Sequence, residues 1–129
     1  MEKELRKILK KMNSYKKKIC VVTGSRAEYG LLKNLILKIK KSKKLDLKLI
    51  VTGMHLSKKY GFTYREILDD NFKIAEKVNI LNNSDNSSAI SQSVSKGIMA
   101  FSKVFAKHKP EILLILGDRF EIFAAASAA

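Results

Sequence analysis

Four short apolar runs alternate along this chain with longer segments in which apolar residues recur every three or four positions. Runs rich in β-branched residues predict strands, and apolar residues at helical spacing predict amphipathic helices. Alternation of the two favours a parallel sheet, because each right-handed crossover returns the chain to the same end of the sheet. We therefore predict an α/β fold of three layers, with helices on both faces of a parallel sheet.

The predicted elements cover the chain from residue 17 onward. The residues before them form a basic extension, in which Leu5, Ile8, Leu9 and Met12 fall at the spacing of a short amphipathic helix. We accordingly divide the chain into an extension, residues 1–16, and a domain, residues 17–129. The predicted strands are residues 19–23, 45–51, 72–81 and 112–116, and the predicted helices are residues 31–39, 64–68 and 89–105 and a segment from residue 119 onward.

The charge of the chain is strongly positive and unevenly distributed. Its 26 Lys and Arg exceed its 12 Asp and Glu by 14. Residues 1–18 hold eight Lys or Arg and two Glu, and residues 33–48 hold seven Lys and one Asp, so two short segments carry +12 of the +14. Aromatic residues do not interleave with these lysines as they do in a base-stacking platform. We expect loose attraction to polyanions at low salt and no specific nucleic-acid partner.

Cysteine content and hydropathy exclude several other classes. Cys20 lies inside the first predicted strand, where we expect a small buried side chain, and a lone cysteine forms no internal disulfide. No apolar run reaches the roughly 18 residues of a membrane span, and the first residues lack the apolar stretch of a signal peptide. We therefore expect a cytoplasmic protein with no membrane partner.

The junction after the first predicted strand, residues 22–30 (VTGSRAEYG), lacks the spacing of a dinucleotide-binding turn and of a P-loop. Ser25 and Glu28 instead form the S-x-x-E pattern of a helix capping box. Arg26 lies in the first turn of that helix, where the helix dipole disfavours a cation. An anion held at the helix N-terminus, such as a phosphate, would account for this arginine.

Two further junctions place titratable side chains after strands. His55 follows the second predicted strand and could bind a ligand or transfer a proton, or could bond to loop backbone. Asp118 follows the fourth strand and could act as a general acid or base, or could cap the next helix through its spacing to Glu121. Arg119 is a second cation in a first helical turn. Because parallel strands share a carboxyl edge, we expect these side chains and Arg26 to converge there.

These motifs resemble those of the UDP-N-acetylglucosamine 2-epimerases. The resemblance runs from about residue 17 to residue 129. It rests, in order, on residues 23–30 (TGSRAEYG), residues 53–56 (GMHL) with the later Tyr60-Gly61 and Thr63-Tyr64, and residues 117–121 (GDRFE). The Arg-Ala-Glu turn, where the non-hydrolysing branch has Arg-Pro-Glu, favours the hydrolysing branch. The resemblance implies a Rossmann-like first domain of a two-domain fold of the glycosyltransferase-B type, of which this chain is an incomplete, N-terminal part.

The resemblance also implies an activity. Members of the hydrolysing branch eliminate UDP from UDP-N-acetylglucosamine or a related UDP-amino sugar and hydrate the resulting 2-acetamidoglucal, which yields a free 2-epimer for sialic-acid-type sugars. No metal or other cofactor is implied, whereas a homo-oligomer of the full-length protein is. By correspondence, Asp118 is catalytic, and Arg26, His55 and Arg119 bind substrate. We expect the chain to be inactive alone, because other catalytic and nucleotide-binding groups lie in parts of the family fold that it lacks.

Three alternatives remain open on the sequence. A non-hydrolysing epimerase would release the epimerised UDP-sugar in place of free sugar and UDP. A non-catalytic module would bind a sugar nucleotide, or would assemble with a separately encoded second half. A basic nucleic-acid-binding protein would bind DNA near physiological salt.

Overall fold

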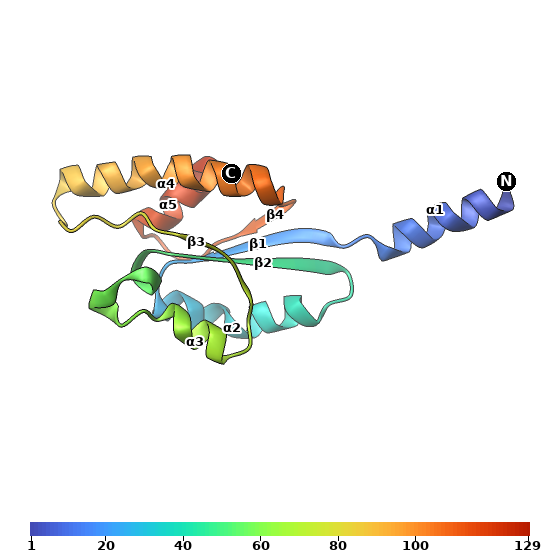
Figure 1. The fold of residues 1–129 in the computed structure, drawn as a ribbon, viewed down its shortest axis with the longest axis horizontal. Coiled ribbons are helices and arrows are strands. Elements are labelled where there is room, and N and C mark those ends of the chain that lie inside the picture. The colour runs from blue at the N-terminus through green and yellow to red at the C-terminus, as the bar shows by residue number, and fades with distance from the viewer.

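The computed structural model of the chain describes residues 1–129. In chain order its elements are α1 (Glu2–Ser14), β1 (Lys17–Thr23), α2 (Arg26–Lys41), β2 (Leu45–Thr52), the 3₁₀ turns η1 (Gly53–Leu56) and η2 (Lys58–Tyr60), α3 (Tyr64–Asp69), β3 (Ile74–Val78), α4 (Ser87–His108), β4 (Ile112–Leu114) and α5 (Phe120–Ala128). The four strands form one parallel sheet in the order β3-β2-β1-β4. Helices α2 and α3 cover one face of the sheet, and α4 and α5 cover the other (Figure 1). The predicted three-layer α/β fold is confirmed.

Alternation along β1 explains how the sheet acquires two buried faces. Ile19 and Val21 pack in the core beneath α2, whereas Cys20 and Val22 pack in the core beneath α4 and α5. Successive strand side chains point to opposite faces, so a continuous apolar run is required where both faces are covered. The thiol of Cys20 is fully buried, as the sequence indicated.

Every predicted strand and helix is present, but two strands are shorter than expected. β3 covers Ile74–Val78, not residues 72–81, and its pairing with β2 is interrupted by a register shift between Leu49 and Ile50. β4 covers Ile112–Leu114, not residues 112–116, because its only partner strand is β1, with which it pairs over three residues. A strand paired on one side alone loses its ladder as soon as the neighbour diverges.

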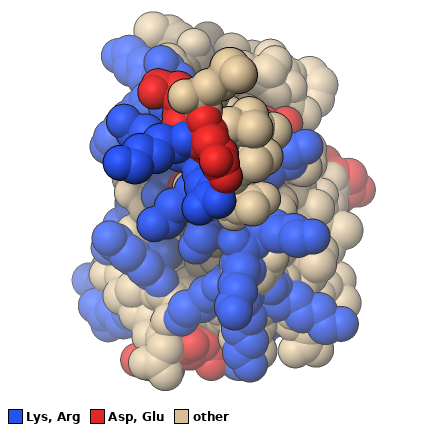
Figure 2. Space-filling model, turned by 90° about the vertical axis from the view of Figure 1, so that its right-hand side faces the viewer, with Lys and Arg blue, Asp and Glu red and all other residues tan.

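The basic extension forms a helix that stands away from the sheet. α1 buries none of its residues, and its apolar positions are all exposed (Figure 1). Figure 2 looks at this side of the molecule and shows Lys and Arg crowded over it. Because β1 and β2 both begin on this side, the basic face lies at the amino edge of the sheet, opposite the carboxyl edge. No helix of the chain is both long and apolar enough to cross a membrane.

Candidate active site

Three glycine-containing loops meet at the carboxyl edge of the sheet. Gly24 follows β1, Gly53 follows β2, and Gly117 lies between β4 and α5. The Met54 amide donates to the Gly24 carbonyl at 2.9 Å and so joins the first two loops. Gly53 has a φ of +58°, and a Cβ at that position would lie only 2.6 Å from Oε1 of Glu121. Glycine is therefore required there, both by backbone conformation and by the close approach of a buried carboxylate.

Two buried glutamates occupy the space between these loops. Glu121 has no exposed surface, and Glu28 is 7% exposed. Oε2 of Glu28 accepts hydrogen bonds from the amides of Gly24 (2.7 Å) and Ser25 (3.1 Å), which forms the predicted capping box, while Oε1 is buried without a hydrogen-bond partner. Burial raises the pKa of Glu28, the amide bond from Gly24 opposes that rise, and the nearby Glu121 adds to it. Close packing of two carboxylates calls for a cation beside them.

Arg119 supplies that cation. It is the N-cap residue of α5, and its Nε donates to both carboxylate oxygens of Glu121, at 3.1 and 3.3 Å, while its Nη2 donates to Oε1 at 2.9 Å. These hydrogen bonds raise the pKa of Arg119 above its ordinary value, so its positive charge is secure. The side chain is nevertheless 38% exposed. One edge of the guanidinium is therefore bound to a buried carboxylate, while the side chain as a whole still reaches solvent.

His55 lies beneath the surface of this edge. Its imidazole has no exposed surface, with Nε2 3.0 Å from Oγ1 of Thr23 and Nδ1 2.8 Å from Oγ1 of Thr63. Burial lowers the pKa of His55 to about 4, against a weaker opposing bond to the Ser25 backbone, so the ring is neutral at pH 7. The imidazole thus contacts two threonine hydroxyls as well as the Ser25 backbone, and it is not open to solvent.

Arg26 and Asp118 are both exposed, but they differ in their surroundings. Arg26 begins α2 as predicted, and its Nε lies 3.1 Å from the carboxylate of Glu66, so its side chain meets an anion of the protein itself. Asp118 lies in the turn before α5. The idea that it caps this helix is wrong, because Arg119 is the N-cap residue and no side chain caps the helix. Asp118 is consequently left free of a structural role in the helix start.

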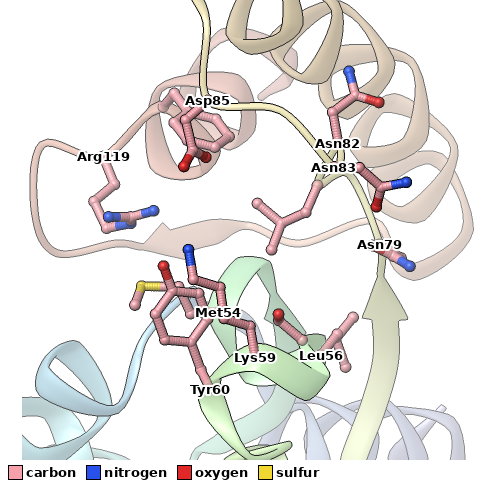
Figure 3. A pocket seen from close by; sticks show the side chains of 12 residues that line it. Met54, Leu56, Lys59, Tyr60, Asn79, Asn82, Asn83, Asp85 and Arg119 are labelled. Carbon is pink, nitrogen blue, oxygen red and sulfur yellow. The ribbon is translucent and has the colours of Figure 1, made fainter.

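A pocket of about 340 Å³ opens beside Arg119, between the loops that follow β2 and β3 and the start of α5 (Figure 3). Its walls combine two cations, a phenol, several amides and a carboxylate. Of the four predicted site residues only Arg119 lines it, Asp118 is the adjacent residue in the chain, and neither Arg26 nor His55 reaches it. The lining residues are Met54, Leu56, Ser57, Lys59, Tyr60, Asn79, Leu81, Asn82, Asn83, Asp85, Arg119 and Phe120.

Sequence reasoning did not identify the amide-rich wall of this pocket, which is formed by Asn79, Asn82 and Asn83. A signal was present, because the Asn- and Ser-rich loop follows a predicted strand and therefore begins at the carboxyl edge. Lys59 was likewise missed, since a lysine in a polar connection carries no pattern of its own. No group of three or more His, Cys, Asp or Glu side chains is arranged to hold a metal ion.

Comparison with known proteins shows which family the chain belongs to. The sequence model of the UDP-N-acetylglucosamine 2-epimerase family matches residues 37–129. The chain belongs to this family. Among its relatives, the GDP/UDP-N,N'-diacetylbacillosamine 2-epimerase (hydrolyzing) of Campylobacter jejuni is 45% identical over 112 residues, or 87% of the chain. The UDP-N,N'-diacetylbacillosamine 2-epimerase (hydrolyzing) of Legionella pneumophila is 40% identical over 114 residues, or 88% of the chain.

Solved structures of the epimerase family share the fold. A crystal structure of a UDP-N-acetylglucosamine 2-epimerase superposes with a TM-score of 0.74 at 25% identity and covers 88% of this chain. The chain in turn spans 29% of that structure, 29% of the Campylobacter epimerase and 30% of the Legionella epimerase. The expected resemblance to the epimerase family is thus confirmed, over the part of the family fold that this chain represents.

Proposed function

We propose that this chain is part of a hydrolysing 2-epimerase of UDP-linked N-acetylated amino sugars and supplies one wall of its active site. Family membership supports the proposal, as do the hydrolysing activities named for relatives that are 45% and 40% identical. The observation that carries it is the fixed guanidinium of Arg119 at a polar pocket on the carboxyl edge. A diphosphate leaving group requires a cation that is already in place when its negative charge develops.

The proposed reaction has two steps. In the first, a base removes the proton from C2 of the sugar while the bond from C1 to the UDP oxygen breaks, which gives UDP and a 2-acetamidoglucal. In the second, water adds across the double bond, its hydroxyl to C1 and a proton to C2 from the face opposite to the one that lost it. Asp118, exposed beside Arg119, is our candidate for one of these proton transfers.

The remaining predicted site residues receive roles that their surroundings permit. Arg26 pairs with Glu66 through a largely exposed contact, and exposed pairs are weak, so its guanidinium can turn to a phosphate at little cost. His55 is buried and neutral between two threonines, and we propose that it shapes the loop after β2 that contacts substrate. Its assignment as a direct substrate ligand stays a prediction.

The names of the relatives supply two candidate substrates. Both relatives above are named for N,N'-diacetylbacillosamine, so the UDP derivative of that sugar is the first candidate and UDP-N-acetylglucosamine is the second. Because the chain spans about 29% of these enzymes, we propose that it is inactive alone and that other catalytic groups come from the remainder of the fold. Cytoplasmic location and homo-oligomerisation stay predictions.

A chimera tests the proposal directly. Residues 17–129 replace the corresponding part of the Campylobacter relative, and release of UDP is followed with each of the two UDP-sugars. We expect turnover in the chimera and a loss of about a hundredfold or more in Asp118→Asn, the range for removing a general acid or base. Asp69→Asn, the same change at an exposed aspartate at the end of α3, serves as the matched control.

The products separate the two epimerase branches. Free 2-epimerised sugar together with UDP identifies hydrolysis, whereas an epimerised UDP-sugar identifies the non-hydrolysing reaction. A folded chimera that releases no UDP from either substrate would contradict the proposal.

A further inference from the structure

Glu121 has a role that the predicted site residues do not cover. Its carboxylate has no exposed surface and packs against two loops, with Oε1 close to Gly53 and its Cβ close to Gly24. A carboxylate taken out of water must be compensated by hydrogen bonds and an opposite charge. Arg119 provides both, and it does so from two positions away on the same helical turn.

The pairing uses only part of the guanidinium. Arginine carries five N–H donors in a rigid plane. Nε–H and one N–H of Nη2 are directed at Glu121, so both hydrogens of Nη1 and the other hydrogen of Nη2 remain available. Because the guanidinium is planar, fixing one edge of the fork also fixes the direction of the other donors. Arg119 lines the pocket, and Figure 3 shows its guanidinium extending into the open space.

We propose that Glu121 is a positioning residue that holds Arg119 as a preformed receptor for the diphosphate of the sugar nucleotide, an inference that rests on the proposed function. An arginine on a flexible stem loses rotamer freedom when it binds an anion, and this lowers affinity. Here much of that rotamer freedom is already lost in the free protein, since Arg119 is hydrogen-bonded to a fully buried side chain. Lys59 lines the same pocket and adds a second positive charge for a dianionic ligand.

Glu28 gives Arg119 a second reason to stay beside Glu121. It is the other buried carboxylate of the cluster, and its charge acts on Arg119 as well as on Glu121. If Arg119 left the cluster to follow a ligand, two buried carboxylates would remain without their cation. The guanidinium is therefore expected to stay where it is and to bind the anion with its outward donors. Asp85 lines the same pocket and repels anions near its own carboxylate, so a bound anion is expected on the side of Arg119 that faces away from Asp85 and toward Lys59.

The test is binding of inorganic pyrophosphate to the 129-residue chain, measured by calorimetry. We expect Glu121→Gln, which keeps shape but removes charge, to weaken binding about tenfold. Arg119→Lys, which keeps the charge but removes the planar set of N–H donors, should weaken pyrophosphate binding at least as much. The double variant Arg119→Ala/Glu121→Gln should bind no more weakly than Arg119→Ala alone, because Glu121 acts only through Arg119. Glu2→Gln, at the exposed Glu2–Arg6 pair, is the matched control and should bind as the unmodified chain does.

A second readout does not depend on the ligand. The Nε–H proton of Arg119 should exchange slowly with water in the unmodified chain and at least tenfold faster in Glu121→Gln, as seen by NMR. Unchanged exchange would overturn the positioning role, and so would additive losses in the double variant. An unmodified chain that binds no pyrophosphate would overturn the receptor role.

Turnover in the chimera separates this inference from the proposed function. Pyrophosphate binding that depends on Glu121, together with a chimera that releases no UDP, would refute the proposed reaction alone. A chimera that keeps its turnover and its KM when it carries Glu121→Gln would refute this inference alone.

Discussion

Nε2 of His55 lies 3.0 Å from Oγ1 of Thr23, so a ring that follows β2 is fastened to the last residue of β1. The other ring nitrogen reaches Thr63, 2.8 Å away, in the segment before α3. A hydroxyl can donate or accept, so a neutral imidazole satisfies both contacts with one N–H and one lone pair. The histidine thus joins the end of β1, the loop after β2 and the segment before α3, and its burial favours the uncharged ring.

We expect this arrangement to make stability depend on pH. The pKa of His55 is about 4 in the folded chain, below the ordinary value near 6.5, so the unfolded chain binds the proton more readily. The contribution of neutral His55 to the free energy of unfolding is therefore complete above about pH 6.5. It is lost as the pH falls toward 4, by up to about 3 kcal/mol. Urea denaturation from pH 8 to 4.5 measures it, with His55→Gln for comparison. Parallel pH profiles for the two chains would contradict the prediction.

Gly97 should be intolerant of even one methyl group. A Cβ there would lie 2.9 Å from Cβ of Ala124 and 3.0 Å from Cδ1 of Ile80, so α4 would be pushed from α5 and from the segment that follows β3. We expect Gly97→Ala to lower the free energy of unfolding by about 1–3 kcal/mol. Gly30→Ala is the matched control, because Gly30 is also helical but has no neighbour within 4 Å of a Cβ. That variant should gain about 0.5–1 kcal/mol, and a loss equal to that of Gly97→Ala would refute the packing argument.

Cys20 should be unreactive until the chain unfolds. Its side chain is fully buried, and burial raises the pKa of the thiol to about 11. At pH 8 a group with that pKa is ionised in about one molecule in a thousand, and only the thiolate attacks a disulfide reagent. We expect Ellman's reagent to modify the native chain at least about a thousandfold more slowly than the chain in guanidinium chloride. Native and denatured rates within tenfold of each other would show that the strand opens readily.

Polyanion binding should be weak, salt-sensitive and separate from the pocket. The basic face lies at the amino edge of the sheet, and the pocket lies at the carboxyl edge (Figures 1 and 2). We expect duplex DNA to bind at about 20 mM salt and to be released by about 150 mM, because such binding depends on counterion release. Lys43→Glu/Lys44→Glu, in the turn before β2, should weaken it, and UDP should not compete. Binding that persists near physiological salt would favour the nucleic-acid alternative.

Local sequence patterns predicted the parts of the structure that depend on neighbours in the chain. The capping box of Ser25 and Glu28 formed as expected, because its partners lie three residues apart. The apolar run of β1 and the helical spacing of apolar residues in α2 were recognised for the same reason. The close approach of α4 to α5 at Gly97 was not predicted, since glycine does not mark an apolar face.

Contacts between loops escaped prediction because they depend on how three strand ends align in space. Arg26 was correctly placed in a first helical turn, yet its partner Glu66 lies 40 residues away. Glu121 fitted a capping pattern with Asp118, but its side chain is buried close to Gly53 and bonds to Arg119. Topology alone predicts that charged residues gather at the carboxyl edge. Which residues pair there depends on the three-dimensional arrangement of the loops.

The detached position of α1 has a practical use. The helix contributes nothing to either core and begins at the end of the molecule remote from the pocket (Figure 1). A biotin or a fluorophore attached at Met1 would therefore hang on a helical spacer of about 20 Å, at about 1.5 Å per residue. A biosensor surface could capture the chain by this handle and leave the Arg119 pocket directed into the bulk solution.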